Sequence, residues 1–137
     1  MFEIVGIDHI VLRTTRLAEM LHFYTVVLGC SIERETPAET GLTQLRAGDA
    51  LIDLVLVDSH LGRLGGAAPG ASGNNLDHFC LQIKPLAESE VTRFLASVGI
   101  DAGEFAERYG AQGWGNSIYI RDPEGNTVEL KNQLPTA

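Results

Sequence analysis

The chain contains one short pattern twice, at matching places in two matching halves. An Asp-His pair opens an apolar run at residues 7–12 and again at residues 76–81. Well after each copy, one acidic residue stands inside another apolar run, Asp53 in the first half and Glu129 in the second. Duplication alone would repeat apolar positions. The repetition of two histidines and two carboxylates indicates that both halves contribute to one site.

Each half is predicted to follow the order βαβββ. Residues 7–13 alternate as a strand does, and an apolar stripe at helical spacing follows until Gly29. The second half repeats this order with a strand at 76–83 and a helix at 87–98, closed by Gly99. The fold class expected from this order is α+β. The remaining predicted strands are 31–35, 43–47 and 50–57, and then a weak strand at 101–106, followed by 117–121 and 127–131.

The chain of 137 residues is expected to form a single domain, 1–137, built from two modules at 4–57 and 76–132. Between the modules, residues 58–75 are rich in Gly, Ala, Ser and Asn, which predicts a flexible linker or a lid. The second half is a few residues longer than the first, and most of the gain falls in 108–116. That segment is predicted to be an extra loop, and a loop present in one half only is a candidate for substrate contact.

Strand alternation predicts which face of each sheet carries the candidate ligands. Each of the four lies opposite an apolar row that suits a covering helix, so all four are expected on the uncovered face. The acidic residues that precede the histidines, Asp8 and Asp77, are predicted to face away and to have a structural role. The four candidate ligands are His9, His78, Glu129 and Asp53.

Two imidazoles with one or two carboxylates suit a single divalent ion such as Zn, Ni, Mn, Fe or Co. A lone strand histidine is more often an ordinary, partly buried residue, so the prediction rests on the repeat as a whole. His9, His78 and Glu129 form the main predicted set. Asp53 has the shorter side chain and is predicted to be a fourth ligand, an outer acceptor or a base.

Composition argues against several partners. The chain has 18 acidic and 10 basic residues and a formal net charge of −8, which disfavours nucleic acid and anionic membrane surfaces. No apolar run has the roughly 18 residues of a membrane-spanning helix, and the N-terminus lacks the pattern of a signal peptide. Two cysteines, Cys30 and Cys80, form no disulfide framework, so a cytoplasmic protein with free thiols is expected.

The combined pattern resembles the vicinal oxygen chelate superfamily, which includes glyoxalase I, fosfomycin- and bleomycin-resistance proteins and extradiol dioxygenases. The resemblance covers roughly residues 4–132. It is carried by Asp-His at both repeats, by Phe23-Tyr24 with Leu28-Gly29, and by the run from Tyr119 to Leu130 with its Asp-Pro-Glu-Gly-Asn turn. It implies paired βαβββ modules whose mixed sheets curl into a cup around a metal, with helices on the outer face.

The resemblance favours a metal-dependent glyoxalase-like enzyme, a lyase or isomerase. Its small substrate would chelate the metal through adjacent oxygens, and Glu129 or Asp53 would move a proton through an enediolate. Glyoxalase I-like enzymes typically carry Glu where Asp53 stands, so this residue is a departure. One alternative is an Fe(II) or Mn(II) ring-cleaving dioxygenase with Tyr109 or Tyr119 as acid/base. Another is a metal-independent small-molecule binding or resistance protein.

Four residues near the extra loop are candidate substrate contacts. Arg108 would hold an anionic group, unless it is a solvated surface residue. Tyr109 and Trp114 would form an apolar wall, unless they only anchor the loop. Ser117 joins them because it accompanies the 108–111 segment in similar small members of the superfamily. The resemblance also implies a homodimer, with the modules paired within one chain or across two.

Overall fold

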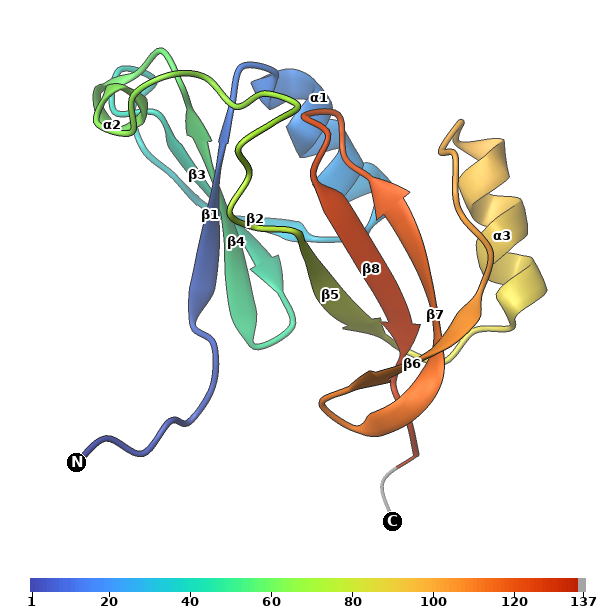
Figure 1. Ribbon diagram of the computed structural model, residues 1–137. Helices are drawn as coiled ribbons and strands as arrows, with labels where there is room; N and C mark the ends of the chain where they lie inside the picture. Colours follow the sequence, from blue (N-terminus) through green and yellow to red (C-terminus); the bar gives the residue numbers. More distant parts are fainter. Residues whose placement is uncertain (136–137) are drawn as a thin grey trace. The chain divides into compact units, whose positions relative to one another are not determined.

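The computed structural model describes residues 1–135, which fall into two compact units. The first unit is Met1–Ala71 and the second begins at Ser72. Figure 1 shows one sheet and one main helical segment in each unit. Among residues 1–135, no helix combines the length and the apolar character that a membrane crossing needs.

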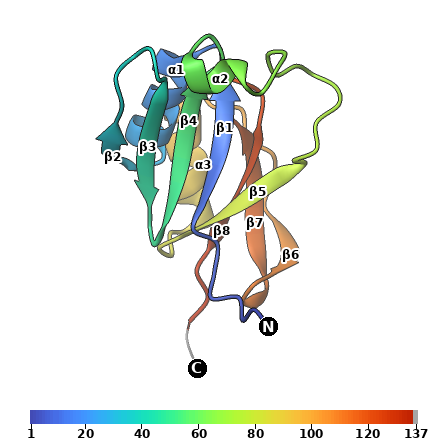
Figure 2. The ribbon, with the colours of Figure 1, turned by 90° about the vertical axis from the view of Figure 1, so that its left-hand side faces the viewer.

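The first unit holds a four-stranded mixed sheet in the order β1-β4-β3-β2. β1 and β4 are parallel neighbours, whereas β4, β3 and β2 pair antiparallel. Figure 2 shows these strands side by side, with α1 behind them. The elements are β1 (His9–Thr14), α1 (Leu17–His22), a π-helical turn η1 (Phe23–Val27), β2 (Ser31–Glu35), β3 (Leu42–Ala47), β4 (Ala50–Leu56) and α2 (His60–Arg63).

The second unit repeats this arrangement with the strand order β5-β8-β7-β6. β5 and β8 are parallel, and the other two pairs are antiparallel. The α+β fold of two βαβββ modules is therefore confirmed. The elements are β5 (His78–Ile83), α3 (Glu88–Ser97), β6 (Ala106–Gly110), β7 (Gly113–Arg121) and β8 (Thr127–Asn132).

In each unit most buried apolar side chains of the strands lie on the sheet face opposite the candidate ligands. In the first unit, Leu12 and Ile52 are buried together with the helical residues Met20, Phe23 and Tyr24. In the second, the buried apolar residues of β7 and β8 alternate with polar ones, several of which are buried as well. The buried apolar set of these two strands is Ile118, Ile120, Val128 and Leu130.

The predicted extra loop at 108–116 is wrong, because the segment forms most of a β-hairpin. β6 and β7 pair with Tyr109 opposite Trp114 and Gly110 opposite Gly113. Gly113 has a φ of +98°, a conformation that glycine adopts without strain and that permits this tight reversal. The Gly-rich composition therefore marks a turn between strands. The weak strand predicted at 101–106 is also displaced, since β6 begins only at Ala106.

The segment 58–75, predicted to be flexible, begins with a helical turn and is tethered to β1. Ser59 caps α2 by accepting a hydrogen bond of 3.0 Å from the Gly62 amide. The Arg13 guanidinium then donates to backbone carbonyls on both sides of the turn that follows. Its acceptors are Gly62 at 3.0 Å, Gly66 at 2.6 Å and Ala67 at 2.9 Å. Composition did not indicate this tether, because its acceptors are backbone atoms.

Candidate functional site

A histidine and a buried glutamate meet on the sheet of the second unit. His78 begins β5, and Glu129 lies in the neighbouring strand β8. The His78 Nε2 lies 3.1 Å from the Glu129 Oε1. Glu129 is only 6% exposed, so its carboxylate is largely removed from water. Burial of a charged group in this way requires a compensating partner, which is the Nε2–H of His78 when that nitrogen is protonated, or a bound cation.

The other ring nitrogen of His78 is also occupied by a carboxylate. Its Nδ1 lies 2.6 Å from the Asp77 Oδ2. The expectation that Asp77 faces away is wrong, because β5 begins at His78 and strand alternation does not extend back to the residue before it. His78 thus stands between two carboxylates, one at each nitrogen. Its ring also meets the Tyr119 ring edge-on, with centroids 5.3 Å apart.

The first unit repeats the first of these contacts. The His9 Nδ1 lies 2.6 Å from the Asp8 Oδ1, so the expectation for Asp8 is wrong for the same reason. This hydrogen bond is the main cause that raises the pKa of His9 above its ordinary value. Desolvation opposes the shift, and the Asp53 carboxylate reinforces it.

Asp53 occupies the position in β4 that Glu129 occupies in β8. Asp53 is paired with Val11, two residues beyond His9, and Glu129 is paired with Cys80, two residues beyond His78. Asp53 is 3% exposed. The amide of Gln44 donates to both of its oxygens, at 3.3 and 3.2 Å. The shorter carboxylate is therefore held by a neighbouring strand, and within residues 1–135 no hydrogen bond joins it to His9.

Two predicted substrate residues are brought together in the second unit. The Arg108 guanidinium donates to the backbone carbonyl of Ser117 at 2.6 Å and to its hydroxyl oxygen at 3.1 Å. The same guanidinium lies over the Tyr119 ring, 4.3 Å from its centroid, as in a cation–π contact. Tyr119 in turn contacts His78. A continuous series of contacts therefore leads from Ser117 and Arg108 to His78 and Glu129.

The aromatic pair of the hairpin is placed differently. Tyr109 and Trp114 meet edge-on with ring centroids 5.4 Å apart, and both are exposed. Because successive side chains of a strand point to opposite faces, Tyr109 is directed away from the face that carries Arg108. The structure therefore pairs Tyr109 with Trp114 but does not bring them to Arg108.

Lys131 was missed as a component of this region. It is 4% exposed and donates to the carbonyls of Arg108 at 2.8 Å and Gly113 at 2.9 Å, one on each strand of the hairpin. Alternation along β8 already places it on the face of Glu129, so the sequence carried a usable signal. On the same face, the thiol of Cys80 has its pKa raised to about 11 by desolvation and by the Glu129 carboxylate, with Lys131 opposing.

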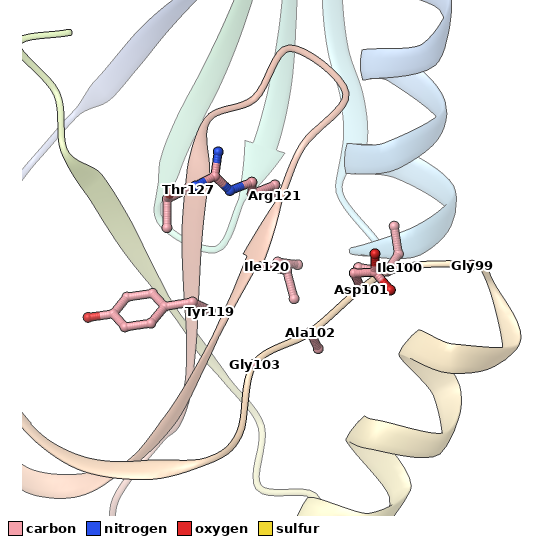
Figure 3. Close-up of a pocket in the computed structure, with 9 residues that line it drawn as sticks. All are labelled: Gly99, Ile100, Asp101, Ala102, Gly103, Tyr119, Ile120, Arg121 and Thr127. Carbon is pink, nitrogen blue, oxygen red and sulfur yellow. The ribbon is translucent and has the colours of Figure 1, made fainter. Parts of the chain in front are cut away.

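A cavity of about 690 Å³ in the second unit lies apart from the predicted substrate residues. It is formed by the 99–103 connection against the ends of β7 and β8 (Figure 3). Tyr119 lines it, but Figure 3 shows the Tyr119 ring directed away from the 99–103 segment. Arg108, Tyr109, Trp114 and Ser117 are not among the lining residues.

The donor atoms suit a divalent ion, although residues 1–135 gather no group of three His, Cys, Asp or Glu side chains that would hold one. An imidazole nitrogen and a carboxylate oxygen are donors for Zn and its neighbours, at about 2.0–2.2 Å each. Two donors of one such ion stand roughly 3.0–3.5 Å apart, depending on its geometry, a range that includes the 3.1 Å between His78 and Glu129. The pair therefore fits as half of a metal centre.

Comparison with known proteins agrees with this fold. The model of the Glyoxalase/Bleomycin resistance protein/Dioxygenase superfamily matches residues 6–130. An integron cassette protein of Vibrio cholerae is 25% identical, with a TM-score of 0.76 over 98% of this chain and 99% of that one. A virulence protein of Salmonella typhimurium is 28% identical, with a TM-score of 0.71 over 97% and 100%.

A lactoylglutathione lyase of Agrobacterium tumefaciens is 23% identical, with a TM-score of 0.67 over 93% of each chain, and shows a likeness of fold. The family match spans both Asp-His pairs and both buried carboxylates. The chain belongs to the Glyoxalase/Bleomycin resistance protein/Dioxygenase superfamily.

Proposed function

We propose that this protein is a metal-dependent enzyme of the glyoxalase type, acting on a small substrate that chelates the metal through adjacent oxygens. The observation that carries the proposal is the 3.1 Å approach of His78 to the buried Glu129. A buried carboxylate beside an imidazole is a strong donor pair for a divalent ion, and superfamily members generally bind such an ion.

In this proposal His9, His78 and Glu129 hold one divalent ion, which is Zn, Ni, Mn, Fe or Co. The ion supplies Lewis acidity to the substrate oxygens and so acidifies the neighbouring C–H. Asp53 remains a candidate fourth ligand or base. Its hydrogen bonds from Gln44 favour the role of base or outer acceptor, because they hold the carboxylate toward Gln44 while each oxygen keeps a second lone pair.

In this proposal, side chains of the protein transfer the proton and hold the substrate. Glu129 or Asp53 takes the proton from one carbon of the substrate and returns it to the next, and their burial protects this transfer from bulk water. Arg108, fixed by Ser117, holds an anionic group of the substrate. Tyr109 and Trp114 remain proposed contacts for a substrate portion that reaches the other face of the hairpin.

Metal content and turnover together test the proposal. The protein as purified is analysed for transition metals. It is then stripped and reloaded with each of the five ions, and assayed on hemithioacetals and α-hydroxy carbonyl compounds. We expect near-stoichiometric metal and turnover with at least one ion. Absence of turnover across all five ions and both substrate classes would reject the glyoxalase chemistry, and absence of metal would favour a metal-independent binding protein.

One observation favours a second candidate, a ring-cleaving dioxygenase. The Tyr119 ring lies edge-on to His78, so a phenol stands near the proposed ligand as an acid/base group of such an enzyme would. Oxygen consumption by the Fe(II)- or Mn(II)-loaded protein with a panel of catechols decides between the two enzymes. We expect no consumption, and rapid uptake would replace the glyoxalase proposal.

We also propose a cytoplasmic homodimer, and the dimer offers a test of how the modules cooperate. Light scattering gives the mass. An inactive His9→Ala protein is then mixed and re-equilibrated with an inactive Glu129→Ala protein. If each site takes one module from each chain, half of the mixed dimers' sites are intact, and about a quarter of the activity returns. If each site lies within one chain, no activity returns.

A further inference from the structure

The same exposed hydrogen bond occurs at the start of the first strand in each unit. Asp8 approaches the His9 Nδ1 to 2.6 Å, and Asp77 approaches the His78 Nδ1 to 2.6 Å. The two aspartate side chains are 91% and 94% exposed. Exposed pairs of this kind stabilise a fold very little, so stability alone gives no reason for two identical copies.

The two units differ at the residues around this pair. Val11 in the first unit corresponds to Cys80 in the second, and Gln44 corresponds to Tyr119 through their pairing with Asp53 and Glu129. The Asp-His contact is retained while its surroundings change. That retention within one chain points to a requirement of the histidine itself.

Imidazole chemistry supplies such a requirement. A neutral imidazole has one N–H and one lone pair, and the hydrogen bond at one nitrogen decides where the proton lies. A carboxylate at Nδ1 keeps the proton there and leaves the lone pair at Nε2. In the second unit, Nε2 is the nitrogen directed at Glu129. A carboxylate behind a ligating histidine also fixes the ring and increases its basicity.

We propose that Asp8 and Asp77 are positioning residues that hold His9 and His78 in the Nδ1–H tautomer, with Nε2 directed at the proposed metal. The two aspartates act through the histidines and have no contact with the ion. The metal-binding part of this inference rests on the proposed function, whereas the tautomer part stands without it.

The tautomer is measured in the metal-free protein by ¹⁵N NMR of the histidine side chains, at a pH where both rings are neutral. At His78 the Glu129 carboxylate competes for the proton at Nε2, but its contact is the longer one, 3.1 Å against 2.6 Å for Asp77 at Nδ1. We therefore expect Nδ1–H at both His9 and His78 in the original chain. Asp8→Ala and Asp77→Ala should each move their own histidine toward the Nε2–H form and leave the other unchanged. Asp8→Asn and Asp77→Asn keep an acceptor oxygen and should restore most of the Nδ1–H form.

Matched controls are Asp49→Ala in the first unit and Asp101→Ala in the second, which remove the same charge elsewhere. Both controls should leave the two tautomers unchanged. The inference is overturned if Nε2–H dominates in the original chain, or if the alanine variants at positions 8 and 77 behave as the controls do. Heteronuclear correlation spectra confirm that each variant is folded, so unfolding is not mistaken for an effect on one ring.

Zn²⁺ titration provides the second readout. Each alanine variant should bind Zn²⁺ about 10- to 100-fold more weakly than the original chain, as other outer-shell substitutions do, with the asparagine variants in between. Unchanged Zn²⁺ affinity would overturn the metal-binding part. If the original chain binds neither Zn²⁺ nor any of the other four ions, the proposed function fails. The tautomer measurement still decides the role of the aspartates in that case.

Discussion

The two halves of the molecule carry the same strand register but treat their buried carboxylates differently. In the β5–β8 half, Glu129 reaches His78 directly. In the β1–β4 half, the equivalent Asp53 is held by Gln44. The two carboxylates differ by one methylene and by one neighbouring residue. With these differences, Glu129 contacts its histidine and Asp53 is held by the Gln44 amide. A repeated backbone therefore does not impose a repeated role.

The residues opposite the two carboxylates extend this contrast. Gln44 in β3 pairs with Asp53, whereas Tyr119 in β7 pairs with Glu129. Gln44 donates hydrogen bonds to the Asp53 carboxylate and does not connect it to the proposed substrate residues. Tyr119 contacts both His78 and Arg108, so the second half joins the proposed metal ligands to the proposed substrate residues. The second half therefore holds the larger part of the proposed site.

The sharpest way to break this contrast is to remove each carboxylate in turn. Glu129→Ala should lose the metal and lower kcat/KM by about 10²- to 10⁴-fold, the range for loss of a proton-transferring group. Asp53→Ala should retain metal and lose less activity. Metal analysis and steady-state kinetics measure both effects, with Glu90→Ala on α3 as the control. Loss of metal from the Asp53 variant alone would reverse the assignment.

A second prediction concerns the thiol beside Glu129. Because the pKa of Cys80 is raised to about 11, its thiolate fraction at pH 8 should be about a hundredfold below that of an ordinary cysteine. Alkylation of the metal-free folded protein at Cys80, followed by mass spectrometry, should be slower by the same factor than in the denatured chain. Glu129→Gln should speed it, since the carboxylate contributes to the shift. Equal rates in the folded and denatured chains would contradict the shift.

A third prediction concerns the stability of the first half. Gln44→Leu leaves the buried Asp53 without its donor and should lower the free energy of unfolding by about 1–3 kcal/mol. Gln44→Leu combined with Asp53→Leu removes both partners and should be nearly neutral. Tyr119→Leu leaves the Glu129 carboxylate beside His78. It should therefore lower the free energy of unfolding by less than Gln44→Leu does. Chemical denaturation gives the three values, and a stable single Gln44 variant would show that the amide is dispensable.

The smallest effect is expected at His9. Because the Asp8 hydrogen bond is the main cause of its raised pKa, Asp8→Ala should return the pKa of His9 toward its ordinary value. Since the pKa is raised in the folded state, the interaction stabilises the fold below the ordinary histidine pKa. That stabilisation is lost as the pH rises through the raised value. An NMR titration measures the change, and an unaltered His9 pKa in the variant would contradict this cause.

The order of the elements and the faces of the strands were predictable from sequence because alternation and helical spacing are local. That local pattern placed Glu129 on the face opposite Val128 and Leu130. It failed for Asp8 and Asp77, because both lie one residue before a strand begins and alternation does not apply there. The sequence does not locate the start of a strand to a single residue. The local pattern also failed for the β6–β7 hairpin, where glycines that suggested a loop leave space for Lys131.

The space beneath the hairpin is set by contacts that lie far apart in the sequence. A Cβ at Gly110 would stand 2.9 Å from the Lys131 Nζ, and one at Gly115 would stand 3.2 Å from its Cε. Glycine is therefore favoured at these two positions because the Lys131 side chain from another strand lies against them. Gln44 presents the same difficulty, because its partner is defined only by the register of β3 and β4.

Lys131 has a consequence for which parts of the hairpin can tolerate substitution. Its two hydrogen bonds clamp both strands of the hairpin from beneath, at Arg108 and Gly113. The exposed side of the hairpin, with Tyr109 and Trp114, is free of that clamp and is open to solvent. Mutations can therefore accumulate on the outer surface while the backbone that carries Arg108 stays in place. The hairpin combines a fixed inner frame with an exposed outer surface that substitutions can change without displacing that frame.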